Sequence, residues 1–345
     1  MNLFYISRLI KSTKFAQKIE VQQITNTIVM IRPINFRMNE QTAVNNYYQK
    51  ILGDVFPAAV QAKALKEFDD FVVKLRGVGV EVIVIADTPN PNTPDSIFPN
   101  NWISFHQDGT IAMYPMFADN RRQERRTDVL DIIEEKGFVI ENVMDYTAAE
   151  EEDVFLEGTG SLLLDRIHKK AYCALSPRAN EDLFIEFCED FEYTPIPFVA
   201  NQTVNGQRMA IYHTNVMMTL AEDFAVVCLQ SIDDKKERKH LIAQLKEDGK
   251  EIINITEQQV VHFAGNMLQV VGDNNQRYTV MSVSAGKVLT KDQRAIIEKS
   301  SIILSSSLET IEAYGGGSAR CMMAEVFLPK AKRLLLCNKK SSNVF

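Results

Sequence analysis

The amino-acid sequence predicts an α/β fold, a single propeller of five strand–strand–helix units arranged with pseudo-symmetry around one axis. Three observations support this prediction. Five short segments resemble one another and recur at intervals of roughly 50–60 residues. A second apolar strand follows each segment, and a helical pattern follows four of those strands. No Pro-, Gly- or Ser-rich linker divides the 345 residues, which favours one domain.

The five similar segments, which we call anchors, each begin with a small polar residue or a thiol and continue into apolar residues. They cover residues 101–105, 161–165, 215–219, 266–270 and 321–325. The second strands are expected at Ile111, Ala171, Ala225, Thr279 and Arg333, and the helices at 119–136, 178–191, 233–248 and 290–299. One such unit cannot bury its apolar faces alone, so the units must pack together and bring the anchors close to the axis.

The region before the first anchor predicts a strand at 28–31, a helix at 57–76 and a strand at 80–86. Residues 1–25 differ in composition from the rest of the chain, because they contain four basic residues and a single acidic residue, Glu20. We expect residues 1–25 to form a poorly ordered extension ahead of one domain at 26–345, with a transit peptide as the alternative.

Composition excludes several classes of protein. The chain has 38 Lys and Arg against 45 Asp and Glu, a net charge of −7, which argues against a generally basic nucleic-acid binder. No apolar run approaches the ~20 residues that a membrane helix needs. The five cysteines are scattered without metal-type spacing, and their odd, sparse count argues against a disulfide framework. We therefore expect a cytoplasmic protein.

A cysteine begins one anchor, and a histidine lies just before another. Cys321 follows the run Gly-Gly-Gly-Ser-Ala-Arg, and consecutive glycines let a backbone approach a ligand closely. His213 lies two residues before the third anchor, so in a strand its side chain shares a face with Asn215. Pseudo-symmetry would bring His213 near Cys321, and this pair is the minimum for nucleophilic thiol catalysis. A small buried thiol is the structural alternative for Cys321.

Acidic and amide residues precede the first two anchors. Glu157 lies in Phe-Leu-Glu-Gly-Thr-Gly, where it could orient His213 or hold a cationic nitrogen, with a solvated edge-strand acid as the alternative. Asp95, Asn100 and Asn101 lie in Asp-Ser-Ile-Phe-Pro-Asn-Asn and offer donors and acceptors that suit a guanidine or urea. The same residue types also favour turns.

Four arginines, at 121, 122, 125 and 126, open the first predicted helix. Such a cluster could bind a substrate carboxylate through paired hydrogen bonds, and we favour Arg125 for this role. A solvated helix face is the alternative. Four arginines are too few to indicate DNA binding, and no metal site stands out in the sequence.

These residues together resemble the superfamily of arginine deiminases, dimethylarginine hydrolases and amidinotransferases, which has the pentein fold. The resemblance covers about residues 26–337. The segment from Asp95 is similar to the family's substrate loop, the segment around Glu157 to its Glu-Gly-Gly motif, His213-Thr-Asn to its His-x-Asp, and the glycine run before Cys321 to its nucleophile loop. The pattern most resembles the branch of citrulline-utilisation hydrolases.

The resemblance implies a cysteine-dependent hydrolase that cleaves a C–N bond of a ureido or guanidino amino acid through a covalent thio-intermediate. The implied catalytic residues are Cys321, His213 and Glu157, and the implied substrate-binding residues are Asp95, Phe98, Asn100, Asn101, Arg125 and Asn215. No cofactor and no metal are expected. The expected partner is a small amino-acid substrate, with a homodimer as a candidate assembly and neither nucleic acid nor membrane.

Three departures from the family pattern bear on the substrate. The substrate loop carries Asn100 and Asn101, Asn215 stands where relatives often have Asp, and Gly160 stands where relatives have an acid. A cationic guanidinium needs paired carboxylates, whereas a neutral ureido group suits mixed donors and acceptors. The sequence therefore favours citrulline over arginine without excluding a guanidine. An amidinotransferase or a non-catalytic binding protein on the same scaffold are the alternatives.

Overall fold

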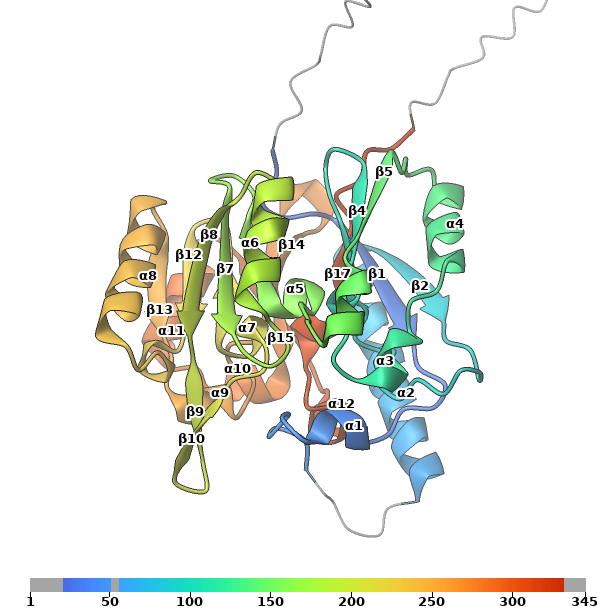
Figure 1. The fold of residues 1–345 in the computed structure, drawn as a ribbon, viewed down its shortest axis with the longest axis horizontal. Helices are drawn as coiled ribbons and strands as arrows, with labels where there is room; N and C mark the ends of the chain where they lie inside the picture. Colours follow the sequence, from blue (N-terminus) through green and yellow to red (C-terminus); the bar gives the residue numbers. More distant parts are fainter. Residues whose placement is uncertain (1–20, 51–55, 332–345) are drawn as a thin grey trace, which may run out of the picture.

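A computed structural model of the chain describes residues 21–50 and 56–331. Its strands form five three-stranded sheets around a centre, together with one two-stranded hairpin (Figure 1). In each of the five sheets, one outer strand runs antiparallel to the central strand, and the other outer strand runs parallel to the central strand. The arrangement confirms the predicted α/β fold of repeated strand–strand–helix units.

Four of the sheets follow one another along the chain, and each sheet forms one unit together with its own helix or helices. These units are described in chain order. The first contains β3 (Ile103–Phe105), β4 (Thr110–Met113), α3 (Asp119–Arg122), α4 (Asp128–Glu135) and β5 (Asn142–Asp145). The second contains β6 (Leu162–Asp165), β7 (Lys170–Leu175), α6 (Glu181–Asp190) and β8 (Thr194–Val199). The third contains β11 (Met218–Leu220), β12 (Phe224–Val227), α8 (Lys235–Glu247) and β13 (Glu251–Asn254). The fourth contains β14 (Leu268–Val271), β15 (Arg277–Ser282), α10 (Val283–Val288), α11 (Lys291–Glu298) and β16 (Ile302–Ser306).

Short helical turns precede the central strands, and a hairpin separates the second and third sheets. The turns are η1 (Pro99–Asn101), α5 (Gly158–Ser161), α7 (Thr214–Met217), α9 (Glu257–Val260) and η5 (Ala319–Met322). The hairpin is β9 (Asn201–Val204) with β10 (Gln207–Ala210), and the remaining turns are η2 (Thr147–Glu152), η3 (Leu229–Ser231) and η4 (Asp273–Asn275). Because α5 and α7 lie at the centre of Figure 1, the segments that begin the anchors converge there.

The fifth sheet joins the two ends of the described chain. Its order is β17 (Ala324–Glu325), β1 (Thr27–Arg32) and β2 (Glu81–Ala86), with α1 (Glu40–Ala43) and α2 (Pro57–Gly77) between β1 and β2 and α12 (Glu309–Gly315) before β17. Ile28 pairs with Glu325, and Val29 pairs with Ala324. The second strand expected at Arg333 lies outside the described residues, and β1 takes the place beside the fifth anchor.

The structure corrects the helix expected at 119–136. Two short helices replace it, because α3 ends at Arg122 and α4 begins only at Asp128. The arginines near this break form hydrogen bonds with groups outside the two helices. Arg122 Nε donates to the Met116 carbonyl at 3.0 Å, and Arg125 Nη1 donates to the Tyr114 carbonyl at 3.3 Å. The third strand was also missed in four sheets, where β5, for example, is short and largely exposed, whereas the strand expected at 80–86 is present as β2.

Neighbouring sheets share their buried apolar side chains, and this sharing closes the ring. Val29 and Ile31 of the fifth sheet pack in one cluster with Ile103 and Phe105 of the first. Further clusters join the first sheet to the second, the second through to the fourth, and the fourth to the fifth. Each strand therefore buries its apolar face only when its neighbour is in place.

Three residues that the sequence assigned to the extension are buried against the domain: Gln23, Ile24 and Thr25. Gln23 Nε2 donates to the Leu164 carbonyl at 2.9 Å, and its Oε1 accepts from the backbone N–H of Arg166 at 2.8 Å. Thr25 Oγ1 donates to the Val326 carbonyl at 2.8 Å. The packed part of the chain thus includes Gln23.

Removing residues 23–25 should lower stability measurably. A form that begins at Asn26 should melt roughly 5 °C below a form that begins at Gln23, because about three buried hydrogen bonds at about 1 kcal/mol each are lost. Thermal unfolding followed by circular dichroism measures the difference. Equal melting temperatures would show that these contacts contribute nothing. A form that begins at Gln22 serves as the control and should match the Gln23 form.

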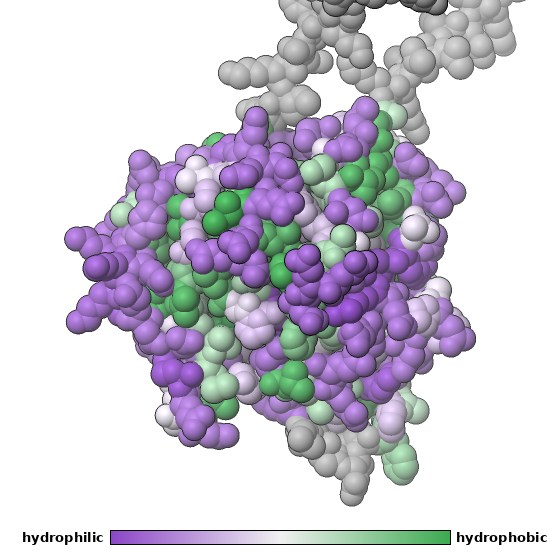
Figure 2. Space-filling model, viewed as in Figure 1, coloured by the Kyte–Doolittle hydropathy of each residue, from purple (hydrophilic) through white to green (hydrophobic). Residues whose placement is uncertain are grey.

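The face of the molecule in Figure 2 is largely hydrophilic, with apolar side chains in small separated groups. Among the described residues, no helix combines the length and the apolar character that crossing a membrane would require.

Candidate active site

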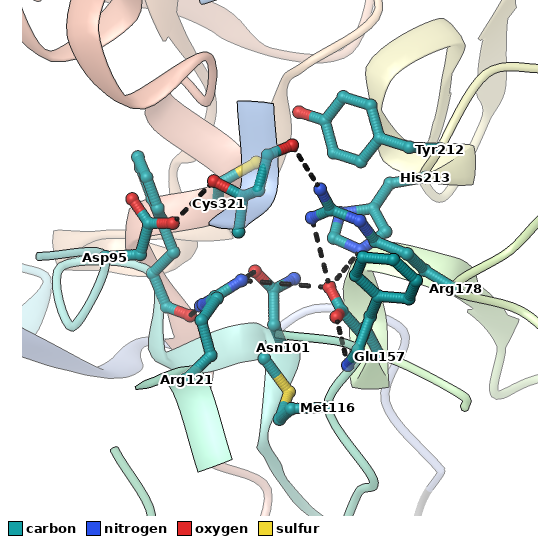
Figure 3. Close-up of polar contacts among 12 residues, drawn as sticks. Asp95, Asn101, Met116, Arg121, Glu157, Arg178, Tyr212, His213 and Cys321 are labelled. Carbon is teal, nitrogen blue, oxygen red and sulfur yellow. Dashed lines mark hydrogen bonds and ion pairs between the residues drawn. The ribbon is translucent and has the colours of Figure 1, made fainter. Parts of the chain in front are cut away.

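Two of the residues that begin the anchors, Asn101 and Cys321, line one small cavity of about 10 Å³ (Figure 3). Five of the residues proposed from the sequence line it: Asp95, Phe98, Asn101, His213 and Cys321. Arg121, Arg178, Tyr212, Asn46, Gly315 and Gly317 complete the lining. Residues from four of the five repeats therefore share one cavity, as the pseudo-symmetry predicted.

Cys321 is held by amide groups from two neighbouring repeats. Its Sγ lies 3.4 Å from Asn215 Nδ2 and 3.2 Å from Asn266 Nδ2. The thiol is almost fully buried. N–H donors around a sulfur favour its ionised form, which is the reactive one. The environment of Cys321 thus differs from the purely apolar surroundings of a structural thiol.

The loop before Cys321 is fixed from both sides. Gly316 has φ of +64°, the left-handed conformation that favours glycine, and it caps α12. Tyr212 donates its hydroxyl hydrogen to the Gly316 carbonyl at 2.7 Å, and Ser318 donates to Glu312 at 2.6 Å. These bonds set the direction in which Cys321 enters the cavity.

His213 and Glu157 form a buried pair, and His213 lines the same cavity as Cys321. His213 Nε2 lies 2.7 Å from Glu157 Oε2, and Glu157 Oε1 accepts from the backbone N–H of Phe117 at 2.9 Å. Burial alone would raise the pKa of Glu157, but Arg178 and His213 hold that pKa well below its usual range. Burial lowers the pKa of His213 to about 4, which the bond to Glu157 offsets only in part. At neutral pH, Glu157 is ionised, and neutral His213 donates through Nε2, which leaves Nδ1 as an acceptor.

The lowered pKa of His213 has a consequence for stability. Unfolded His213 has a pKa of about 6.5, so between pH 6.5 and pH 4 the unfolded chain binds a proton that the folded chain does not. The stability that neutral His213 gives at pH 7 is therefore lost as the pH falls through this window. We expect about 2 kcal/mol of this loss between pH 7 and pH 5.

Urea unfolding at pH 7 and pH 5 tests this expectation. His213→Gln should be less stable at pH 7 but should lose about 2 kcal/mol less than the wild type on going to pH 5. Identical pH dependence in both proteins would contradict the lowered pKa of His213.

Two glycines allow the segments to approach one another here. Gly158 has φ of +43°, and an added Cβ at this position would collide with the Asn100 carbonyl. A Cβ at Gly160 would lie 2.8 Å from His213 Nδ1. A side chain at 160 would therefore occupy the space beside the acceptor nitrogen, which explains why this position holds glycine.

Asp95 lines the cavity and has one carboxylate oxygen without a hydrogen-bond partner among the described residues. Its Oδ2 accepts from Asn39 Nδ2 at 2.8 Å and from Thr42 Oγ1 at 3.1 Å. Within residues 21–50 and 56–331, no hydrogen-bond partner reaches its Oδ1. Burial raises the pKa of Asp95, against the opposing effect of Arg121. A buried acceptor without a partner indicates a ligand that donates to it.

The three other predicted residues of this loop have different surroundings. Phe98 packs against the glycine loop, since Cβ atoms at Gly315 and Gly317 would approach its ring within 3 Å. Asn101 accepts from Arg121 Nη1 at 2.9 Å, and its Nδ2 has no partner among the described residues. Asn100 is fully buried, but it does not belong to the cavity lining.

The structure corrects the choice among the arginines. Arg125 does not line the cavity, because its guanidinium forms a paired contact with Glu150, with Nη2 2.8 Å from Oε2. Arg121 and Arg178 line the cavity instead. Arg121 pairs with Glu124 through two hydrogen bonds of 2.9 Å.

Arg178 bridges Glu157 and residues 39–46, which we call the covering segment and which contribute Asn46 to the cavity lining. Its Nη1 lies 3.5 Å from Glu157 Oε2, and its Nη2 donates to the Thr42 carbonyl at 3.0 Å. Asn46 Nδ2, from the same segment, donates to the Gly315 carbonyl at 3.2 Å. A cavity of about 10 Å³ holds roughly one water molecule, so an amino-acid ligand needs more room than the cavity offers in this structure.

The charges of this buried cluster do not balance. Asp95, Glu124 and Glu157 supply three carboxylates, whereas Arg121 and Arg178 supply two guanidinium groups. Glu124 and Glu157 are both within ion-pair distance of an arginine, whereas no ion pair of Asp95 occurs among the described residues. Burial raises the pKa of Glu124 to about 7 and also raises the pKa of Asp95. The site is consequently less poor in carboxyl groups than the sequence suggested.

One group of potential metal ligands lies elsewhere. Ligand atoms of Asp165, His168 and Asp248 lie within 4.8 Å of one another. Lys250 Nζ is 3.1 Å from Asp165, and Lys170 Nζ is 2.7 Å from Asp248. These ammonium groups already occupy the place that a cation would take.

Comparison with known structures identifies the fold class. Full-length ArgZ, an arginine dihydrolase from the ornithine-ammonia cycle in cyanobacteria, matches with a TM-score of 0.68 at 16% identity, over 89% of this chain and 41% of ArgZ. A dimethylarginine dimethylaminohydrolase variant, as its adduct with S-methyl-L-thiocitrulline, matches with a TM-score of 0.55 at 14% identity, over 88% of this chain and 99% of the other. The fold is that of the pentein superfamily. This chain spans about two fifths of full-length ArgZ.

A family comparison places the chain more closely. The family model described as "N,N dimethylarginine dimethylhydrolase, eukaryotic" matches residues 32–328. The chain belongs to this family, whose members hydrolyse guanidino C–N bonds. A search of curated protein sequences gives no match.

Sequence reasoning missed several residues of the site, namely Arg178, Asn266, Glu124, Tyr212 and the covering segment 39–46. One signal was present for Arg178, because it follows the second strand of its repeat just as Arg121 does in the repeat before. Asn266 opens an anchor, as Asn101 and Asn215 do, and could have been chosen on that ground.

Proposed function

We propose that this chain is a cysteine-dependent hydrolase that cleaves a C–N bond of an arginine-like guanidino amino acid. The main support is the shared cavity, which is lined by Cys321, neutral His213 and Asp95, and one oxygen of Asp95 has no hydrogen-bond partner among the described residues. A guanidinium supplies the positive charge that Asp95 lacks and places its carbon beside the thiol. Membership of a guanidine-hydrolysing family supports the same substrate class.

The proposed reaction has two halves. His213 Nδ1 takes the proton of Cys321, and the thiolate attacks the guanidinium carbon. His213 then gives the proton to the departing amine, the C–N bond breaks, and an S-linked thiouronium remains on Cys321. Next, His213 takes a proton from water, and the hydroxide adds to the same carbon. The C–S bond then breaks while the added hydroxyl loses its proton to solvent, which releases a neutral ureido product, and His213 returns its proton to the thiolate. Glu157 holds His213 in the required tautomer throughout.

Arg178 is the proposed partner of the substrate α-carboxylate. Its Nη2 donors bond to Thr42 and Asn45 of the covering segment in the closed form. When that segment moves to admit substrate, a carboxylate can take the same two donors. Arg121 is less suited to this role, because Glu124, Asn101 and the Phe98 carbonyl already occupy its donors.

A substrate screen tests the proposal. Arginine, its methylated forms, agmatine and citrulline are incubated with the enzyme, and released ammonia or methylamines are measured. We expect release from at least one guanidino amino acid and weaker release from agmatine, which has no α-carboxylate for Arg178. No amine release above that of the Cys321→Ser protein from any guanidino compound would contradict the proposed function.

A ureido amino acid such as citrulline is the second candidate substrate, and the pattern of the citrulline-utilisation branch points to it. Asn101 Nδ2 lies without a partner in the described part of the site, and Asn215 and Gly160 stand where relatives carry acids. A carbonyl oxygen could accept from the Asn101 amide. The screen separates the two candidates, and added acceptor amines in the same assay reveal amidino transfer by mass spectrometry.

A further inference from the structure

The fourth anchor contributes a residue that the proposed reaction leaves without a role. Asn266 begins this anchor, immediately before β14, and its side chain is buried. Its Nδ2 lies 3.2 Å from Cys321 Sγ, closer than the 3.4 Å from Asn215 Nδ2 to the same sulfur. The reacting atom is therefore in direct contact with the fourth repeat.

The backbone fixes which end of the Asn266 amide faces the thiol. Oδ1 accepts the backbone N–H of Arg320 at 3.0 Å, and Nδ2 donates to the Asn215 carbonyl at 2.9 Å. Reversing the amide would place an oxygen against a carbonyl and an N–H against an N–H, so the reversed orientation is excluded. The second hydrogen of Nδ2 is then the one that meets Cys321 Sγ.

The amide of Asn215 has no such constraint. Its Nδ2 can donate to Cys321 Sγ at 3.4 Å, and its Oδ1 can accept from the same sulfur at 3.8 Å. Asn215 can thus form a hydrogen bond with either the thiol or the thiolate of Cys321, whereas Asn266 can only donate a hydrogen bond to the sulfur. The guanidinium of Arg320 does not replace that donor, because its Nη1 donates to the Met323 carbonyl and its Nη2 to Glu325.

We propose that Asn266 is a further catalytic residue, whose fixed N–H donation stabilises the thiolate of Cys321. The thiolate occurs twice in the reaction, as the attacking nucleophile and as the group released when the thiouronium is hydrolysed. Asn266 acts at both points, since its donor does not turn away when the sulfur changes state. This inference rests on the proposed function, in which Cys321 is the nucleophile.

Alkylation of Cys321 by iodoacetamide at a series of pH values tests the role of Asn266 without any substrate. Asn266→Asp keeps an acceptor for the Arg320 N–H and replaces the donor that faces the sulfur. We expect its alkylation midpoint to move up by about one pH unit or more, with roughly tenfold slower alkylation at pH 7. Asn266→Ala, which removes the donor without adding a charge, should shift the midpoint in the same direction. The signal from the other thiols is measured in the Cys321→Ser protein and subtracted.

Asn215→Ala is the matched control, because it removes the other amide that contacts the same sulfur. The inference holds if both Asn266 variants move the midpoint further than Asn215→Ala does, with melting temperatures that show folded protein. It is overturned if the Asn266 variants keep the wild-type midpoint, or if they shift it no more than the control. If Cys321 in the wild-type protein reacts no faster than the other thiols, the nucleophile assignment fails, and the inference falls with it. The two failures are thus distinguishable.

Discussion

Replacing Cys321 by serine should reduce turnover of any guanidino substrate by at least about a thousandfold while leaving the fold intact. A serine hydroxyl is far less ionised than a thiol at neutral pH, and the amide groups of Asn215 and Asn266 are too weak to compensate. The side chains are similar in size, so the packing around position 321 changes little. Steady-state kinetics and thermal unfolding together measure the outcome.

Two controls make this result interpretable. Cys173→Ser changes another buried cysteine, which lies in β7 and lacks contact with the cavity. It should keep most of the activity. If Cys321→Ser retains more than a few per cent of the wild-type rate, Cys321 is not the nucleophile. A variant that binds substrate without turnover would also allow the Michaelis complex to be studied directly.

Replacing Asp95 by asparagine should lower kcat/KM for arginine-like substrates by about 10²–10³-fold, since loss of one partner of a buried charge costs about 3–5 kcal/mol. The effect on citrulline should be much smaller, because a neutral ureido group brings no charge into the cavity. The ratio of the two kcat/KM values is therefore the informative quantity. If one substrate shows no turnover, its binding is measured by calorimetry.

Asp87→Asn serves as the matched control for Asp95. Asp87 is also buried, but its carboxylate accepts from Ser96 at 2.7 Å and from Thr93, and it does not line the cavity. We expect Asp87→Asn to change stability without changing the preference between arginine and citrulline. Equal loss of activity toward both substrates in Asp95→Asn would show that the carboxylate serves the loop rather than a cation.

The repeated pattern in the sequence predicted where much of the candidate site lies. Cys321, His213 and Glu157 stand at or just before anchors, so their convergence followed from the pseudo-symmetry alone. The closure of the fifth sheet did not, because β17 contributes two residues and its partner β1 lies at the other end of the chain. Pairing over such a separation leaves no local signal in the sequence.

The arginines show a second limit of sequence reasoning. A continuous helix at 119–136 would place Arg121 and Arg125 on one face, and either could then bind substrate. The break after Arg122 turns Arg125 toward Glu150, while Arg121 remains in the cavity with Glu124. Only the ends of two short helices decide this, and helix ends are weakly encoded in local sequence.

The pairing of β1 with β17 also sets the order of events during biosynthesis. Strand β1 is synthesised roughly 300 residues before β17, so this pairing can form only after nearly all of the described chain has been made. Cys321 and Asn266 belong to the last two anchors to be translated, and β17 follows Cys321 by only three residues. The nascent protein therefore gains the Cys321 thiol at nearly the same moment as it gains the strand that completes the fifth sheet. A polypeptide released early, before Cys321, carries the histidine and the acids of the candidate site but not the cysteine.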